Sequence, residues 1–246
     1  MAENSYISYG GSLKVNNSVL LNNAKLIINS SQWTCIVGKS GSGKSTILRT
    51  LANLTIDKAF TRKLDIKFSN VNINKISWIT QNPIILPWLN ILDNVILGYK
   101  LRRQKVSKEK ALLFLEKVGL KSFSHKFPHI LSGGMTQKLI LARTLMEDSD
   151  LILMDEPFSS LDAITREEIQ ILSFRLFQKK TVIMVTHDVL ESIVLSEKLY
   201  LLSDRVFTPI LLPKRKPIRK ISSQILSSRE KILRKMENSQ GNMECI

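Results

Sequence analysis

The sequence feature that most constrains the fold is a glycine-rich turn between an apolar run and a helical pattern. Residues 33–38 (WTCIVG) form a short run typical of a β-strand, and residues 38–46 read GKSGSGKST. Residues 44–52 (KSTILRTLA) then have the pattern of a helix. In such a turn, successive backbone N–H groups can point at one anion, and the N-terminus of the next helix adds a favourable dipole. The order of strand, glycine turn and helix predicts an α/β fold with a phosphate-binding loop.

The loop matches the pattern G-x-x-x-x-G-K-[S/T], which assigns roles to individual residues. Lys44 is expected to reach the β- and γ-phosphates of a nucleotide, and the hydroxyl of Ser45 is expected to ligate Mg²⁺. The residues predicted to bind the nucleotide here are Gly38, Ser40, Gly41, Gly43, Lys44, Ser45 and Thr46. The loop therefore predicts a site for a nucleoside triphosphate with Mg²⁺.

Besides Ser45, a second group that holds the metal is expected from residues 151–156 (LILMDE), an apolar strand that ends in two acidic residues. In an open parallel sheet, ligands bind beyond the carboxyl ends of the strands. Asp155 is therefore predicted to lie on the Mg²⁺ side of the site. Glu156 is the candidate base that orients or deprotonates the attacking water.

The rest of the chain continues the α/β alternation, with one helical interruption. Strands are expected at 150–154 and 181–186, with a helix at 163–179 between them. Ser107 is a predicted N-cap and Gly119 a predicted helix stop, so residues 85–148 are interpreted as a helical insertion. The ATPase domain is expected to span residues 1–205, which include this insertion.

Composition excludes several classes of protein. The two cysteines, Cys35 and Cys245, lie too far apart in the sequence for a disulfide framework or a metal-binding cluster. The N-terminal residues lack the pattern of a signal peptide, and no run reaches the roughly 18 apolar residues of a membrane-spanning helix. We therefore expect a cytosolic chain.

The net charge of +15 is unevenly distributed: residues 213–246 carry nine Lys and Arg against three Glu, so this segment alone contributes +6. We interpret residues 206–246 as a basic C-terminal tail. Its plainest interpretation is a solvated face or a frayed terminus. An anionic membrane surface and nucleic acid are the alternatives.

The segment 131–137 (LSGGMTQ) identifies the kind of nucleotide site. A serine and two glycines precede a helix expected at 135–146, so hydroxyl and N–H donors converge on one anion site. In combination with the phosphate loop and LILMDE, in this order, the segment resembles the signature of the ATP-binding-cassette (ABC) ATPases. The resemblance covers residues 5–205. It includes Gln81 in WITQNP, Asp162 after Ser-Leu, and His187 in Thr-His-Asp.

The resemblance implies a P-loop core with a mostly parallel sheet, flanking helices, an antiparallel N-terminal subdomain and an inserted helical subdomain. It implies that Gln81 touches Mg²⁺ and the attacking water, and that His187 contacts the γ-phosphate. It places Asp162 at a dimer seam. By the same resemblance, Ser132 and Gly134 bind the γ-phosphate of ATP held by the other subunit, so two chains form a homodimer in the ATP-bound state.

Several strings resemble those of importers: DEPFSSLD, VTHDVLES, and LPW followed by LDNV, which is similar to the nitrate/sulfonate/taurine branch and its transporters of pyrimidine precursors. The resemblance implies transmembrane permease subunits, an extracytoplasmic substrate-binding protein and a peripheral position on the cytoplasmic face of the cell membrane. Trp88 either faces the permease or packs in the core of the insertion.

Two alternatives to an importer subunit remain: the ATPase subunit of an exporter, and a soluble ABC ATPase linked to nucleic acid. The basic charge is the only support for the second. Soluble ABC proteins of translation carry two cassettes in one chain, and those of chromosome maintenance carry long coiled coils. This chain shows neither pattern. We therefore expect no nucleic-acid partner.

Overall fold

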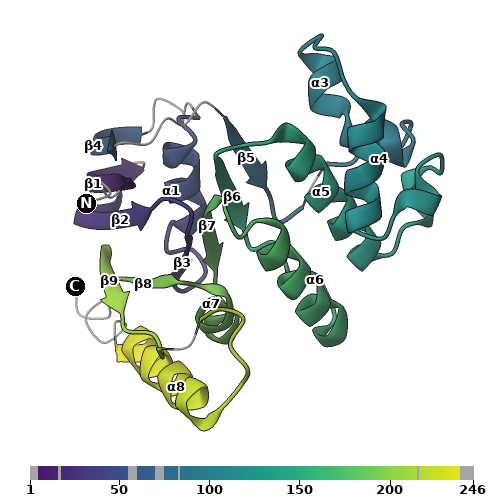
Figure 1. Cartoon of the computed structure of the whole chain (residues 1–246). Helices are drawn as coiled ribbons and strands as arrows, with labels where there is room; N and C mark the ends of the chain where they lie inside the picture. Colours follow the sequence, from purple (N-terminus) through teal and green to yellow (C-terminus); the bar gives the residue numbers. More distant parts are fainter. Residues whose placement is uncertain are drawn as a thin grey trace.

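The computed structural model describes residues 5–15, 18–54, 60–69, 75–82, 84–214 and 216–238, which form two sheets and their covering helices (Figure 1). The antiparallel sheet has the order β2-β1-β4, with strands β1 (Tyr6–Val15), β2 (Ser18–Asn29) and β4 (Phe60–Ser69). The larger sheet has the order β5-β6-β7-β3-β8-β9, with strands β5 (Ile76–Ile79), β6 (Leu151–Asp155), β7 (Thr181–Thr186), β3 (Trp33–Val37), β8 (Lys198–Ser203) and β9 (Val206–Ile210). All its pairs are parallel except β8–β9. The predicted α/β class is confirmed.

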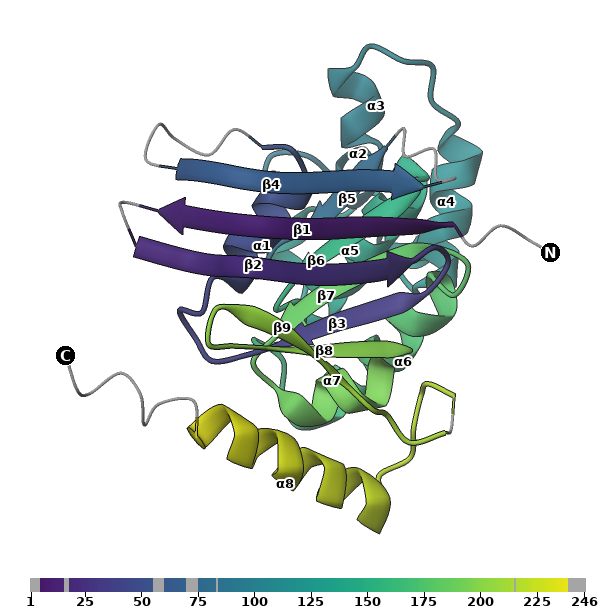
Figure 2. The same ribbon diagram turned by 90° about the vertical axis from the view of Figure 1, so that its left-hand side faces the viewer.

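Some of the helices lie on the two faces of the larger sheet, and the others extend away from it (Figure 1). The helices are α1 (Lys44–Leu51), α2 (Ile91–Val95), α3 (Leu97–Leu101), α4 (Lys108–Lys117), α5 (Gly133–Glu147), α6 (Ala163–Leu176), α7 (Val189–Leu195) and α8 (Ser223–Asn238). Helix α1 lies between the two sheets, and α5, α6 and α7 cover the opposite face (Figures 1 and 2). None of the described helices is long and apolar enough to cross a membrane.

The central strands supply two cores because successive side chains of a strand point to opposite faces. Cys35 and Met184 belong to the core on the side of α5 to α7. Ile36 and Ile183 belong to the core shared with α1 and the antiparallel sheet. Strands buried on both faces are apolar throughout, which explains why these runs were recognisable in the sequence.

The segment between β5 and β6 is largely helical and includes α2 to α5. Helix α4 begins as predicted at Ser107, whose Oγ accepts a hydrogen bond from the backbone N–H of Lys110 at 3.0 Å. It ends before Gly119, which has a φ of +75°. A glycine in this left-handed conformation terminates a helix without the strain that a Cβ would add.

The interpretation of the C-terminal residues as a frayed terminus is wrong for the part that the structure describes. Strand β9 pairs with β8, so the larger sheet extends beyond residue 205. Helix α8 buries Ile225, Ile232 and Met236, whose spacing places them on one helical face. The basic residues lie between these apolar positions in the sequence. A prediction from the net charge of this segment therefore missed a helix that packs on the domain.

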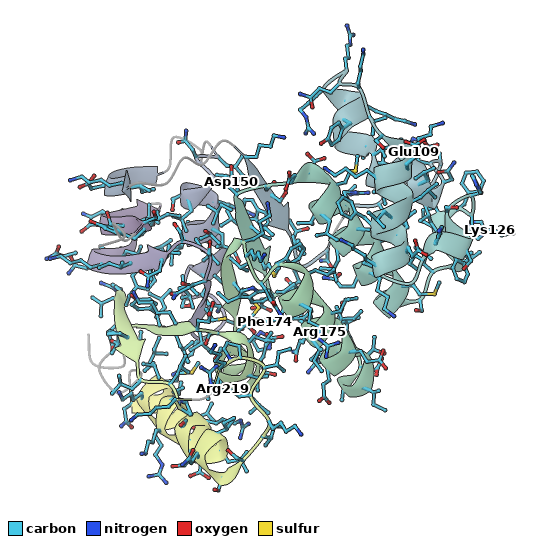
Figure 3. The ribbon with its side chains drawn as sticks, in the orientation of Figure 1. Glu109, Lys126, Asp150, Phe174, Arg175 and Arg219 are labelled. Carbon is cyan, nitrogen blue, oxygen red and sulfur yellow. The ribbon has the colours of Figure 1, made fainter. Side chains whose placement is uncertain are left out.

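Arg219, in the connection to α8, fixes this segment to the end of α7. Its side chain is only 6% exposed, and Nη1 donates to the carbonyl oxygens of Ile193 at 2.9 Å and Ser196 at 2.6 Å. Figure 3 shows Arg219 between α7 and α8. A cation at a helix C-terminus complements the helix dipole, so this residue is part of the folded domain.

We predict that Ile232→Ala destabilises the protein by about 2 to 5 kcal/mol, because it removes a buried side chain and leaves a cavity under α8. Leu226→Ala, on the exposed side of the same helix, is expected to change stability by less than about 0.5 kcal/mol. Urea denaturation of both variants checks this. Equal, small effects would show that α8 does not pack on the domain in solution.

Candidate functional site

Four of the predicted functional segments leave the larger sheet at one edge. Strands β5, β6, β7 and β3 are consecutive neighbours and run parallel, so their carboxyl ends meet on the same side. Gln81 follows β5, Asp155 and Glu156 end β6, His187 follows β7, and Gly38 follows β3. This edge is where open parallel sheets bind ligands.

The phosphate loop turns tightly around the side chain of Lys44. Its Nζ donates to the carbonyl oxygen of Gly38 at 2.8 Å and to that of Lys39 at 2.7 Å. The φ angles of Gly41 and Gly43 are +78° and +91°, in the region that favours glycine. A Cβ on Gly38 would lie 2.8 Å from the carbonyl oxygen of Leu202. The glycines are therefore required by backbone geometry and close packing.

The ammonium group of Lys44 is buried. Burial lowers its pKa, and the nearby carboxylates of Glu156 and Asp155 oppose that effect. An ammonium group has three N–H donors and two are used on the loop, so a third can be directed at an anion. A partly desolvated cation on a glycine-rich turn suits the binding of phosphate.

Ser45 and Asp155 come together from α1 and β6. The Oγ of Ser45 donates to Oδ1 of Asp155 at 2.8 Å. Burial raises the pKa of Asp155, while this hydrogen bond and the charges of Arg49 and Lys44 act in the opposite direction. A hydroxyl and a carboxylate oxygen are ligands that Mg²⁺ prefers, so these two residues fit the predicted metal role.

Glu156 and His187 form the next contact. Oε2 of Glu156 lies 2.9 Å from Nδ1 of His187, and the two side chains are 16% and 51% exposed. The φ of Glu156 is +46°, unusual for a non-glycine residue, and its backbone N–H donates to the carbonyl oxygen of Val185. Such strain is typical of functional sites.

Gln81, Ser40 and Gly41 are exposed, and Thr46 is half-buried. In the described part of the chain, no hydrogen bond or ion pair joins Gln81 to Asp155 or Ser45. The structure thus brings Gln81 to the correct sheet edge, and its role at the metal stays a prediction.

The phosphate loop also borders a cavity of about 300 Å³. Residues 39–42 of the loop form one wall, Val19 and Leu20 of β2 form a second, and residues 202–205 form a third. Met236 of α8 completes the lining. A cavity beside a phosphate loop offers space for another part of a nucleotide, with apolar side chains on two sides.

Ser132, Gly134 and Asp162 form a second cluster, at the N-termini of α5 and α6. Oγ of Ser132 accepts from the N–H of Met135 at 3.3 Å, and Oδ1 of Asp162 accepts from that of Thr165 at 3.0 Å. A Cβ on Gly134 would lie 2.5 Å from Cγ2 of Thr165, so the two helix ends are in close contact. In the part of the chain that the structure describes, none of the three predicted residues hydrogen-bonds to the phosphate loop.

The two clusters are connected through Gln137 of α5. Its Nε2 donates to the carbonyl oxygen of Pro157 at 2.8 Å, and both groups are buried. Pro157 follows Glu156 directly. The helix that carries Ser132 is therefore fixed to the segment that carries the candidate base.

Sequence reasoning missed a buried polar network behind His187. Glu191 of α7 is 7% exposed; its Oε2 accepts from Oγ1 of Thr186 at 2.5 Å, and its Oε1 accepts from Nε2 of Gln170 at 2.9 Å. Burial raises the pKa of Glu191 to about 7. The available signal was a single charged residue, Glu191, within the mostly apolar segment VLESIVL.

Comparison with known proteins agrees with this arrangement. The family described as ABC transporter matches residues 21–159. An uncharacterized ABC transporter ATP-binding protein of Haemophilus influenzae is 42% identical over 193 residues, which are 78% of this chain and 79% of that protein.

Two further relatives have names that state a substrate. The aliphatic sulfonates import ATP-binding protein SsuB 1 of Paracoccus denitrificans is 39% identical, over 76% of this chain and 74% of that one. The nitrate import ATP-binding protein NrtD of Synechocystis is 36% identical, over 76% and 72%. A solved structure described as an inward-facing metal-chelate type ABC transporter has a TM-score of 0.71 at 21% identity, over 93% of this chain and 90% of that one, and supports the fold.

We predict that Glu191 makes stability depend on pH. Its pKa is about 7 in the folded state and near 4.5 when exposed, so between these values the folded state binds more protons and the free energy of unfolding falls as pH rises. Glu191→Gln removes this dependence. Relative to wild type, the variant should gain on the order of 3 kcal/mol between about pH 4.5 and pH 8.

Urea denaturation of both proteins across this pH range measures the difference. Glu167→Gln, which changes an exposed glutamate on α6, is the control and should follow wild type. Parallel pH profiles for wild type and Glu191→Gln would contradict the prediction.

Proposed function

Because the chain belongs to the ABC transporter family, whose ATP-binding subunits are ATPases, we propose that it hydrolyses ATP to power the import of a small solute. The observation that carries the proposal is the convergence at one sheet edge of the Ser45–Asp155 and Glu156–His187 pairs beside the phosphate loop. The first pair would hold the metal ion, and the second contains the candidate general base. Phosphoryl transfer to water requires both kinds of group next to an anion site.

Binding of the triphosphate is assigned to the loop and α1. The backbone N–H groups of residues 38–46 and the ammonium of Lys44 neutralise the β- and γ-phosphates. Ser45 and Asp155 would hold Mg²⁺, together with Gln81. The metal supplies charge neutralisation of the phosphate oxygens when it is bound.

Glu156 is the proposed base. Its carboxylate lies 2.9 Å from Nδ1 of His187, a contact that orients the carboxylate. When both ring nitrogens carry a proton, Nδ1–H donates to Glu156 and Nε2–H can donate to an oxygen of the γ-phosphate. The water that attacks the γ-phosphorus transfers its proton towards Glu156, and ADP is the leaving group. The left-handed backbone of Glu156 holds its side chain at this position.

The active form is proposed to be a dimer. Ser132, Gly134 and Asp162 belong to a cluster with no hydrogen bond to the phosphate loop of the same chain, within the described residues. Ser132 uses its oxygen as an acceptor in the helix cap, so its hydroxyl proton is available for an anion. A second chain would place this cluster against the first chain's ATP and complete two composite sites.

The importer assignment and its partners rest on the relatives. SsuB and NrtD are named for the import of aliphatic sulfonates and of nitrate, so we propose a solute of this kind or a pyrimidine precursor. The proposed partners are transmembrane permease subunits and, indirectly, an extracytoplasmic binding protein. The chain would then lie on the cytoplasmic face of the cell membrane.

Trp88 supplies a candidate permease contact. It is 70% exposed, which excludes its placement in the core of the helical segment, and Ile84 and Pro87 are exposed close by in the sequence. Exposed apolar side chains that are grouped, with an aromatic residue among them, are typical of interaction sites. This segment follows Gln81, so a permease contact here would connect directly to the ATP site.

We predict that Glu156→Gln abolishes steady-state hydrolysis and stabilises a dimer when ATP and Mg²⁺ are present. The substitution removes the proton acceptor but keeps the size and position of the side chain. Gel filtration with multi-angle light scattering measures the mass. The same variant with ADP should stay monomeric, and a monomer at saturating ATP would contradict the sandwich arrangement.

We predict that Trp88→Ala separates transport from hydrolysis. In the native host, Glu156→Gln should abolish uptake of radiolabelled solute by removing ATP hydrolysis. Trp88→Ala should reduce uptake at least tenfold and leave the ATPase rate of the isolated subunit within about twofold of wild type. An aliphatic sulfonate, nitrate and a pyrimidine precursor are the solutes to compare.

Leu211→Ala, which truncates another highly exposed apolar side chain, is the control and should transport normally. Normal uptake of all three solutes by Glu156→Gln cells would contradict the proposed function. Normal uptake by Trp88→Ala cells alone would exclude only the permease contact.

A further inference from the structure

A chain of buried hydrogen bonds connects α6 to the loop that carries His187. Gln170 donates to Glu191 at 2.9 Å, and Thr186 donates to the other carboxylate oxygen of Glu191 at 2.5 Å. All three side chains are buried. Buried and mutually satisfied polar groups of this kind hold one geometry, because each alternative leaves a donor or an acceptor without a partner.

The network is attached to both sides of His187. Thr186 precedes it, and Oγ1 of Thr186 also accepts a hydrogen bond from the N–H of Asp188 at 3.0 Å. Asp188 in turn caps α7 through the N–H groups of Leu190 and Glu191. The backbone before and after His187 is thus held by one hydroxyl, whose own orientation is fixed by the carboxyl group of Glu191.

The imidazole of His187 needs this support from its backbone. The ring is half exposed, and its contact with Glu156 is the hydrogen bond described above. An exposed side chain gains little orientation from packing. Small shifts in the Thr186–Asp188 backbone therefore change the distance between Nδ1 and the candidate base.

At its other end, the network reaches the segment between Glu156 and α6. Arg166 is one turn before Gln170 on α6, and its guanidinium donates to the carbonyl oxygens of Phe158 at 3.2 Å and Leu161 at 2.7 Å. Helix α6 begins after Asp162, the predicted dimer-seam residue. The same helix thus contacts the predicted seam and the support of His187.

A carboxyl group at position 191 is costly to bury among the other buried residues of α7, which are Val189, Ser192, Ile193 and Leu195. The hydrogen bonds from Gln170 and Thr186 offset this desolvation penalty, so the carboxyl group depends on both partners for its position. The charges closest to Glu191 are Asp188, which disfavours its ionised form, and Arg166, which favours it. A costly buried acid that contacts the residue before a catalytic histidine suggests a role in the reaction.

We propose that Glu191 is a positioning residue for ATP hydrolysis, which acts through Thr186 to hold His187 against Glu156 and connects this contact to α6 through Gln170. The proposal rests on the proposed role of His187. It assigns Glu191 no contact with the substrate. Its loss should lower kcat and leave the KM for ATP nearly unchanged, because the phosphate loop is not involved.

The first measurement is steady-state ATPase kinetics. Glu191→Leu and Thr186→Val remove the hydrogen bonds and should lower kcat at least tenfold with KM within about twofold. Glu191→Gln and Thr186→Ser keep a hydrogen-bonding group of similar shape and should recover most of kcat. Ser173→Ala, which deletes a different buried hydroxyl on α6, is the control for general loss of packing and should stay within about twofold of wild type.

The second measurement is a signal from His187 itself. The chain has three histidines, and His125 and His129 are exposed in a different segment, so an NMR spectrum of histidine-labelled protein should give three resolvable ring signals. His187→Ala assigns the signal of interest. Glu191→Leu and Thr186→Val should shift the His187 signal and leave those of His125 and His129 in place.

The outcomes separate this inference from the proposed function. If His187→Ala retains full ATPase activity, the proposed catalytic role of His187 is wrong. If His187→Ala is inactive but Glu191→Leu keeps wild-type kcat, only the positioning role is overturned. A reduced kcat with an unchanged His187 signal would also overturn it, because the loss would then come from elsewhere in the fold.

Discussion

The pairing of β7 with β6 and β3 fixes the relative positions of the candidate catalytic groups. All residues of β7 and β3 are buried, and the register places Val37 opposite Thr186 and Asp155 opposite Val185. A shift by one residue would turn every side chain to the opposite face and exchange the contents of the two cores. The register is therefore held by the hydrophobic free energy of both cores. Gly38, Glu156 and His187 leave the sheet as neighbours as a consequence.

The functional groups at the carboxyl ends of the parallel strands lower the free energy of unfolding, and the hydrophobic core offsets that loss. Lys44 and Asp155 are removed from water far enough to shift their pKa values towards the neutral forms, and Glu156 has a backbone conformation that few non-glycine residues adopt. Each effect is destabilising by itself. An anionic nucleotide with a divalent cation would favour the charged forms of both side chains. The site is thus arranged for a ligand of high charge.

The sequence predicted the parts of the site that depend on local backbone chemistry. The glycines around Lys44, the strand that ends at Asp155 and the capping serine at 132 each have a requirement that can be read from neighbouring residues. Long-range packing could not be read in this way. The exposure of Trp88 depends on the fold of the helical segment, and the docking of α8 depends on three apolar residues within a basic stretch. The role of Glu191 depends on Gln170, which lies 21 residues earlier and on another helix.

The contacts between α5 and α6 indicate how the second cluster can act as one unit. The close approach of Gly134 to Thr165 places the two helix N-termini, which carry Ser132 and Asp162, in direct contact. Gln137 then ties this pair to Pro157, beside the candidate base. In the proposed dimer, Ser132 would bind the partner's ATP, and its helix pair contacts Pro157, which follows Glu156, and Glu191 through Gln170. Packed helices and buried hydrogen bonds would thus connect the occupancy of one composite site to the geometry of the base in the other.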